Sequence, residues 1–230
     1  MDINRIRLRH RAYRYLLFLE VLMICIIPFS FKYPVALSTS ALAFVIYVIF
    51  FLHKVTLLRR GVRAMFLLGI LTFLVEVIWI VTDLNNCFLF LSVFCFVDQS
   101  LLGLLRFSLW FLYFGIILFR LIKSLIREPF VTTSVVMGAG AGYLMIGFVG
   151  GVLLNTIYYL QPQAFVHLPH NPAAILNIAA FGYLTTLGSS VINQKHLFAQ
   201  VAALFITLGG QLYVAILIAL VLSRYHRRRS

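Results

Sequence analysis

Apolar runs of about 20 residues recur along this chain, and they limit its fold more than any other feature. A run of this length crosses a hydrocarbon core roughly 30 Å thick as one α-helix. The chain is 63% hydrophobic and only 11% charged, a balance that excludes a soluble domain. We therefore expect an all-α membrane protein. Six runs are expected to cross the membrane: residues 15–31, 35–53, 64–81, 101–122, 131–160 and 197–223.

The basic residues favour six helices with both termini on one side of the membrane. Sixteen of the 19 Lys and Arg precede the first run, lie between the second and third, lie at the end of the fourth or between it and the fifth, or follow the sixth. Such clusters mark the cytoplasmic side. We expect a multi-pass protein of the plasma (inner) membrane with cytoplasmic termini. The net charge of +13 then reflects orientation and contact with anionic cytoplasmic lipids, and nucleic acid is not expected as a partner.

A shorter apolar segment, residues 171–190, lies between the fifth and sixth runs and is interrupted by turn-forming residues. Its length and apolarity are typical of a re-entrant segment. Non-helical backbone at membrane depth is tolerated only where it is buried in protein or lines a water-filled path. The residues expected to line such a path are Thr185, Thr186, Leu187, Gly188, Ser189 and Ser190.

Three motifs follow one another in the last hundred residues. They are the glycine-rich run 138–147, the sequence 181–188 that ends in Thr185-Thr186-Leu187-Gly188, and the run 209–219 that begins Gly209-Gly210-Gln211-Leu212-Tyr213. Together they resemble the pore module of bacterial potassium channels, in which a re-entrant loop joins two helices. The resemblance implies a homotetramer, because one loop supplies a quarter of a ring-shaped pore. It implies a flexible point at Gly209 and Gly210 for gating, and no cofactor beyond permeant monovalent cations such as potassium.

The loop departs from that family in its outer half. The family's selectivity filter has the form Thr-x-Gly-Tyr-Gly-Asp, whereas this chain has Thr186-Leu187-Gly188-Ser189-Ser190-Val191. Because filter carbonyls replace the hydration shell of the ion, the resemblance implies ion sites at Thr186, Leu187 and Gly188. Ser190 adopts left-handed backbone less readily than the family's glycine. We expect a wider, hydroxyl-lined outer mouth with weak potassium selectivity, or no conduction.

Three functions stay open from the sequence: a cation channel, a non-conducting membrane assembly or sensor protein built on the same module, and a secondary transporter as the third. Oligomeric state and ion flux separate them. We divide the chain into a four-helix transmembrane bundle, residues 1–128, and a pore module, residues 129–230, that ends in a basic tail. Within the first part, residues 87–97 are apolar but short, and we expect them to form a half-inserted helix.

Two charges lie inside apolar runs, Glu76 in the third and Arg106 in the fourth. Intramembrane charges usually pair with one another, so we expect these two side chains to neutralise each other, with Glu20 as a third candidate member. Arg106 is the only Arg or Lys in the membrane-crossing part of the fourth run. Voltage sensing through that helix is therefore not expected, because it needs several charges.

The remaining candidates are weaker. No nucleophile, base and orienting acid occur together at membrane depth, so we expect no enzyme activity. His167 and His170 have metal-ligand spacing, but a solvated loop is the simpler interpretation. Cys25, Cys87 and Cys95 form no complete set of pairs, and pairing of Cys87 with Cys95 stays open. The small-residue spacing in the fifth run permits either close packing within the chain or contact between subunits. That spacing comprises Gly138, Gly142, Gly147 and Gly151.

Overall fold

The computed structural model describes residues 3–55, 59–85, 99–128, 132–166, 168 and 172–227. Within these ranges the chain is helical and contains no β-strand. The half-inserted helix expected at 87–97 lies outside them. The helices are α1 (Ile3–Ile26), α2 (Pro34–Val55), α3 (Arg59–Asn85), α4 (Gln99–Ile126), α5 (Thr133–Leu160), α6 (Pro172–Leu184) and α7 (Leu197–Arg227), with 3-10 turns at Ile27–Phe31 and Pro162–Ala164.

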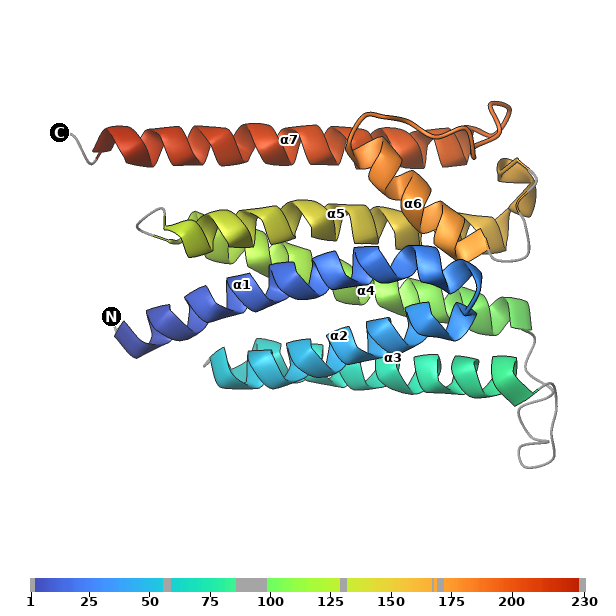
Figure 1. The fold of residues 1–230 in the computed structure, drawn as a ribbon, viewed down its shortest axis with the longest axis horizontal. Helices are drawn as coiled ribbons and strands as arrows, with labels where there is room; N and C mark the ends of the chain where they lie inside the picture. The colour runs from blue at the N-terminus through green and yellow to red at the C-terminus, as the bar shows by residue number, and fades with distance from the viewer. Residues whose placement is uncertain are drawn as a thin grey trace.

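The long helices alternate in direction, so that α1 begins and α7 ends at the same end of the molecule (Figure 1). Five stretches are long and apolar enough to cross a membrane, which indicates a membrane-embedded protein. The described apolar part of α2, Ser38–Val48, is shorter, so the number of six crossings stays a prediction. The five are His10–Ser30, Ala64–Thr82, Leu101–Ile126, Thr133–Leu160 and Leu197–Ala219.

Several helices extend beyond the apolar runs that predicted them. α1 begins at Ile3 and α3 at Arg59, each within a basic stretch that precedes its apolar run. Arg and Leu have high helix propensity, so a helix that nucleates in the membrane continues through such residues. Apolarity therefore locates the crossing, while the helix itself ends where the backbone meets a turn.

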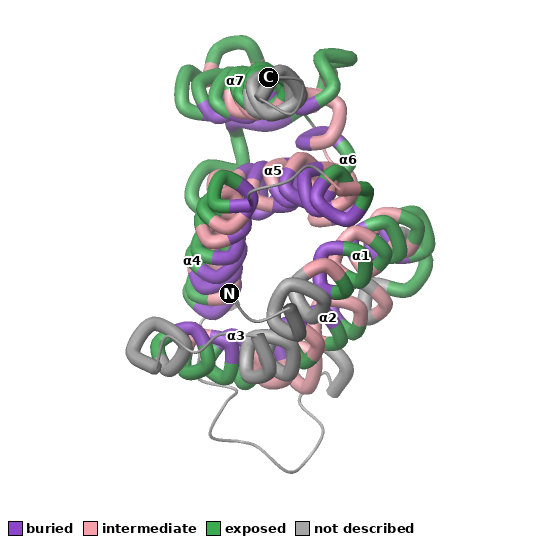
Figure 2. Tube along the Cα trace, turned by 90° about the vertical axis from the view of Figure 1, so that its left-hand side faces the viewer, coloured by how far each residue is buried: buried purple, intermediate pink, exposed green. Residues whose placement is uncertain are grey.

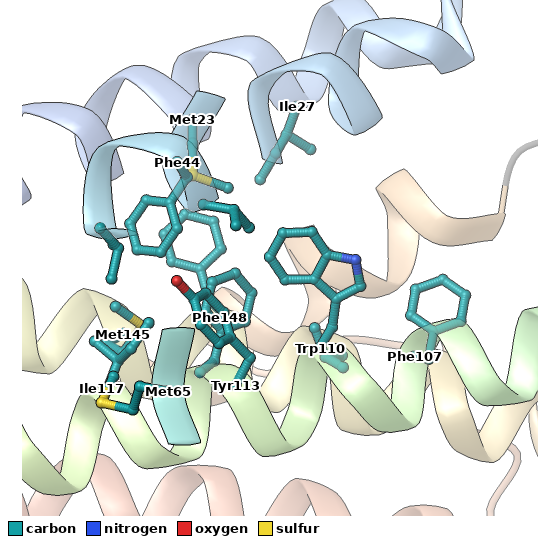
Figure 3. Packing of buried hydrophobic residues seen from close by; sticks show 14 of the residues in the cluster. Met23, Ile27, Phe44, Met65, Phe107, Trp110, Tyr113, Ile117, Met145 and Phe148 are labelled. Carbon is teal, nitrogen blue, oxygen red and sulfur yellow. The ribbon is translucent and has the colours of Figure 1, made fainter. Parts of the chain in front are cut away.

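Helices α1 to α5 surround a common hydrophobic core, and α7 lies outside this group against α5 (Figure 2). The centre is filled by aromatic side chains (Figure 3). Phe114 of α4 lies 5.4 Å from Phe44 of α2, 4.9 Å from Trp110, and 6.1 Å from Phe148 of α5, between ring centroids. Such contacts add about 0.5–1.5 kcal/mol each beyond area burial. α5 thus completes the N-terminal bundle while also supporting α6 and α7.

The glycines of α5 receive side chains of the same chain. A Cβ atom on any of four buried glycines would overlap a neighbouring side chain, so no larger residue fits without displacement. These glycines therefore serve packing within the chain, and assembly of subunits through α5 and α7 stays a prediction. The pairs are Gly138 with Tyr13 of α1, Gly142 with Tyr213 of α7, and Gly147 and Gly151 with Phe181 and Asn177 of α6.

Adding one methyl group at Gly147 should therefore destabilise the protein. A Cβ there would lie 2.6 Å from Cδ1 of Phe181, and overpacking typically costs about 1–3 kcal/mol. Gly115 in α4 is the matched control, because a Cβ there meets nothing within 4 Å. We expect Gly147→Ala to lower the thermal unfolding temperature in detergent and Gly115→Ala to leave it unchanged or raise it. Equal effects at the two positions would contradict this packing.

Candidate functional site

The candidate site is the end of α6 and the loop that follows it. α6 starts near the end where α5 ends and runs back beside α5 and α7, after which the chain returns to the start of α7 (Figure 1). Leu184, its last residue, packs on Gly210, where a Cβ would lie 2.6 Å from Leu184 Cδ1. Gly210 lies near the middle of the apolar stretch Leu197–Ala219. α6 therefore ends deep within the apolar part of the molecule.

The return to α7 is fixed by two backbone hydrogen bonds. The N–H of Val166 donates to the carbonyl of Val191 at 2.8 Å, and the N–H of Asn193 donates to the carbonyl of Ala164 at 2.9 Å. These bonds flank an isolated bridge between Phe165 and Ile192. The loop 185–190 is thus held at both ends, by α6 on one side and by the segment after α5 on the other.

The last four carbonyls of an α-helix have no hydrogen-bond donor within the helix. In α6, all four of these carbonyls accept hydrogen bonds from elsewhere. Within the loop, the N–H groups of Thr185, Thr186 and Gly188 supply three of these donors. Their acceptors are Phe181 at 3.0 Å, Tyr183 at 3.1 Å and Gly182 at 3.0 Å. The Tyr143 hydroxyl donates to the Leu184 carbonyl at 3.1 Å, and the Thr207 hydroxyl donates to the Tyr183 carbonyl at 3.0 Å.

The carbonyls of the loop itself, unlike those at the end of α6, lack hydrogen-bond donors among the described residues. Those of Thr185, Thr186, Leu187 and Gly188 accept no hydrogen bond from any residue that the structure describes. All four residues are exposed, and Leu187 is 87% exposed. An unpaired backbone group in hydrocarbon costs several kcal/mol. Four free carbonyls at this depth therefore require water, ions or another chain.

The loop backbone alternates in the sign of φ. Thr186 has φ of 64° and Gly188 has φ of 75°, while Leu187 between them has no positive φ. A positive φ is common for glycine but a genuine outlier for a β-branched residue such as threonine. Such backbone strain, of order 1–3 kcal/mol, clusters at functional sites. The alternation lets the N–H groups of Thr186 and Gly188 both reach α6, while the loop keeps free carbonyls.

The outer residues of the loop lie against α6. The Tyr183 hydroxyl donates to the Ser189 carbonyl at 2.7 Å. The Gly188 oxygen lies 2.6 Å from the place that a Cβ on Gly182 would occupy. A pocket of about 650 Å³ borders the outer end of the loop, where it is lined by Ser189, Ser190, Asn193, Gln194, Lys195 and Gln200.

Gly209 and Gly210, which begin the third sequence motif, lie within the uninterrupted helix α7. A Cβ on Gly209 would meet only Ile146, at an ordinary 3.8 Å. Gly210 is buried beneath Leu184 and allows α7 to approach the end of α6. The structure therefore gives Gly210 a packing role, and the gating role expected for both glycines stays a prediction.

The structure brings Glu76 and Arg106 together inside the bundle. Arg106 Nε donates to Glu76 Oε2 at 2.7 Å and Nη2 donates to Oε1 at 2.6 Å, a side-on bidentate pair. Trp110 Nε1 also donates to Oε2 of Glu76 at 2.8 Å, and Arg106 Nη2 donates to the Ser38 hydroxyl at 3.0 Å. Glu76 is fully buried and Arg106 is 11% exposed. The pair thus connects α2, α3 and α4.

Glu20 does not join this pair. Its carboxyl group is buried in α1, and neither oxygen has a hydrogen-bond partner among the described residues. The sequence pointed to Glu20 only as a third intramembrane charge, because nothing in its spacing distinguishes a bundle-facing position beside Arg106 from one elsewhere on α1.

Most of the candidate histidines and cysteines lie outside the described residues. These are His167, His170, Cys87 and Cys95, whereas Cys25 is a free, exposed thiol. In the part of the chain that is described, no three His, Cys, Asp or Glu side chains gather to hold a metal ion.

Sequence reasoning missed the residues that position the loop. Tyr143, Tyr183 and Thr207 bind carbonyls of the loop or of the end of α6, and Gly182 gives the loop room. Three of them come from three different helices, so no local pattern groups them. Tyr143, Gly182 and Tyr183 lie within the motif stretches of the sequence, but nothing in those stretches assigned them a role in holding the loop.

Comparison with protein families, with curated proteins and with solved structures found no match to this chain. The resemblance to potassium channels therefore rests on the motif residues alone. Functional inference must come from the geometry of the loop.

Removing one member of the charge pair should cost far more than removing both. Arg106→Leu leaves a buried carboxylate without its cation, which typically costs about 3–5 kcal/mol. Adding Glu76→Gln removes that charge and keeps an acceptor for Trp110. We expect the double variant to unfold at a higher temperature than Arg106→Leu alone in detergent. Additive losses from the two single variants would contradict the pairing.

Proposed function

We propose that this chain is one subunit of a homotetrameric cation channel. Monovalent cations, with potassium the leading candidate, pass between four copies of the segment Thr186-Leu187-Gly188. Ser189 and Ser190 form the outer mouth. The main support for this proposal is the row of carbonyls from Thr185 to Leu187, which accept no hydrogen bond from a described residue and follow Leu184, the residue that packs on Gly210 near the middle of α7. Rings of backbone carbonyls are the means by which potassium-type filters replace the hydration shell of an ion.

The orientation of α6 supports a cation over an anion. Its C-terminal end adjoins the loop, and a helix C-terminus carries about half a negative elementary charge. In membrane transport proteins, half-helix C-terminal ends and unwound carbonyls coordinate cations. The segment from Pro172 to Ser190 contains no Lys or Arg, and Lys195 borders the pocket at the outer end of the loop.

Exposed apolar surface supports assembly around the loop. A face of α7 is apolar and exposed in the single chain, and Leu187 projects from the loop at 87% exposure. One loop with two flanking helices encloses only part of a ring, so we commit to further copies of this chain as the cover. Lipid covers the outer helices. The exposed face includes Leu197, Phe198, Leu204, Phe205, Leu212 and Ile216.

The proposed arrangement has six crossings, cytoplasmic termini and a location in the plasma (inner) membrane. α1 to α4 form a peripheral bundle, whose basic cytoplasmic end contacts anionic lipid. α5, α6 and α7 form the pore module. This assignment follows the positive-inside pattern of the sequence and the alternating helix directions in Figure 1.

Ion flux with a matched pair of threonine variants tests the function. The protein is reconstituted in liposomes with potassium or sodium gradients. We expect flux from the wild type and at least about a tenfold loss in Thr186→Val, because the innermost hydroxyl ring is removed. Thr156→Val is the control, since the Thr156 hydroxyl only bonds Val152 within α5, at 2.9 Å. Absence of flux from folded wild-type protein would favour the non-conducting assembly or sensor instead.

A further inference from the structure

Two carbonyl oxygens of the loop lie against the last turn of α6. The Ser189 oxygen accepts the Tyr183 hydroxyl at 2.7 Å. The Gly188 oxygen lies at the position where a side chain on Gly182 would begin, 2.6 Å from an ideal Cβ. Both contacts are made by the last turn of α6, which ends at Leu184.

We infer that Gly182 and Tyr183 are the residues that set ion selectivity, because they withdraw the Gly188 and Ser189 carbonyls from the ion path. This inference rests on the proposed channel function. Gly182 acts by its missing side chain, which gives the Gly188 oxygen a place on the helix. Tyr183 acts by its hydroxyl, which occupies the Ser189 oxygen. Neither residue touches the ion, so both are positioning residues.

The consequence is a short filter. The carbonyls that remain free of both contacts are those of Thr185, Thr186 and Leu187. Discrimination between potassium and sodium depends on the number and field strength of the coordinating carbonyls or on the size of the site they form. A path with carbonyl rings only in its inner part therefore distinguishes the two ions weakly. The side chains of Ser189 and Ser190 do not by themselves explain the weak discrimination, because the groups that change direction are the backbone carbonyls.

The pocket beside the outer loop allows this arrangement to change. Tyr183, Ser189 and Ser190 all border the same space of about 650 Å³. The outer loop therefore has room on that side, and few contacts oppose its rotation. Besides the bond from Tyr183, Ser189 takes part in one long hydrogen bond, in which the Val191 N–H donates to the Ser189 hydroxyl oxygen at 3.4 Å.

Two variants release the two carbonyls separately. Tyr183→Phe removes the hydroxyl and keeps the ring, and Gly182→Ala displaces the Gly188 oxygen. Matched controls change an equivalent group without touching either carbonyl. Thr156→Val removes a hydroxyl that bonds only Val152 within α5, at 2.9 Å, and Gly115→Ala adds a methyl group in α4 where a Cβ meets nothing within 4 Å.

The measurement is the potassium-to-sodium permeability ratio, taken from reversal potentials in planar bilayers under bi-ionic conditions. We expect Tyr183→Phe and Gly182→Ala each to raise the ratio at least about threefold, and both controls to leave it unchanged. Elution as wild type on size-exclusion chromatography shows that a variant is assembled. If Gly182→Ala does not assemble, Tyr183→Phe alone decides.

The outcomes separate this inference from the proposed function. A conducting wild type with an unchanged or lowered ratio in assembled Tyr183→Phe overturns the inference and leaves the channel intact. A lowered ratio would mean that the hydroxyl holds a coordinating carbonyl in place instead of withdrawing one. A wild type that carries no current overturns the channel function itself.

Discussion

Backbone groups inside a membrane need partners, and the structure around α6 follows from that requirement. A helix that stops at membrane depth leaves four carbonyls without an intrahelical donor. The loop N–H groups and the hydroxyls of Tyr143 and Thr207 satisfy them. The loop's own carbonyls, from Thr185 to Gly188, then accept no hydrogen bond from a described residue. The end of α6 is thus stable only where something outside this single chain meets those oxygens.

α5 makes this arrangement possible because it packs on two sides. Its buried glycines accept Tyr13 of α1 on one side, and Phe181, Asn177 and Tyr213 from α6 and α7 on the others. The aromatic core around Phe114 and Phe148 holds the same helix in the N-terminal bundle (Figure 3). The ion pair of Glu76 and Arg106 connects α3 and α4 within the same bundle. A rigid α5 thereby positions α6 and the loop with respect to the whole bundle.

The sequence predicted the helical class and the location of the candidate loop, because apolar length and an interrupted apolar segment depend on local composition. It also pointed to Glu76 and Arg106, since two intramembrane charges have few alternatives to meeting. It failed where the answer depends on which helix faces which. The α5 glycines look alike from sequence whether they contact Tyr213 of the same chain or another subunit. The directions of the Gly188 and Ser189 carbonyls follow from φ angles and from the Tyr183 hydroxyl, to which the sequence motif assigned no role.

The proposed channel binds cations between the loops of several copies of this chain. An electron-microscopy or crystal structure of the protein in lipid, with thallium as a heavy substitute for potassium, would locate such cations. We expect four copies around one axis, with thallium on that axis at the level of Thr186 and Leu187 and none coordinated by the Ser189 carbonyl. A monomer or dimer, or four copies with no cation density between the loops, would contradict it.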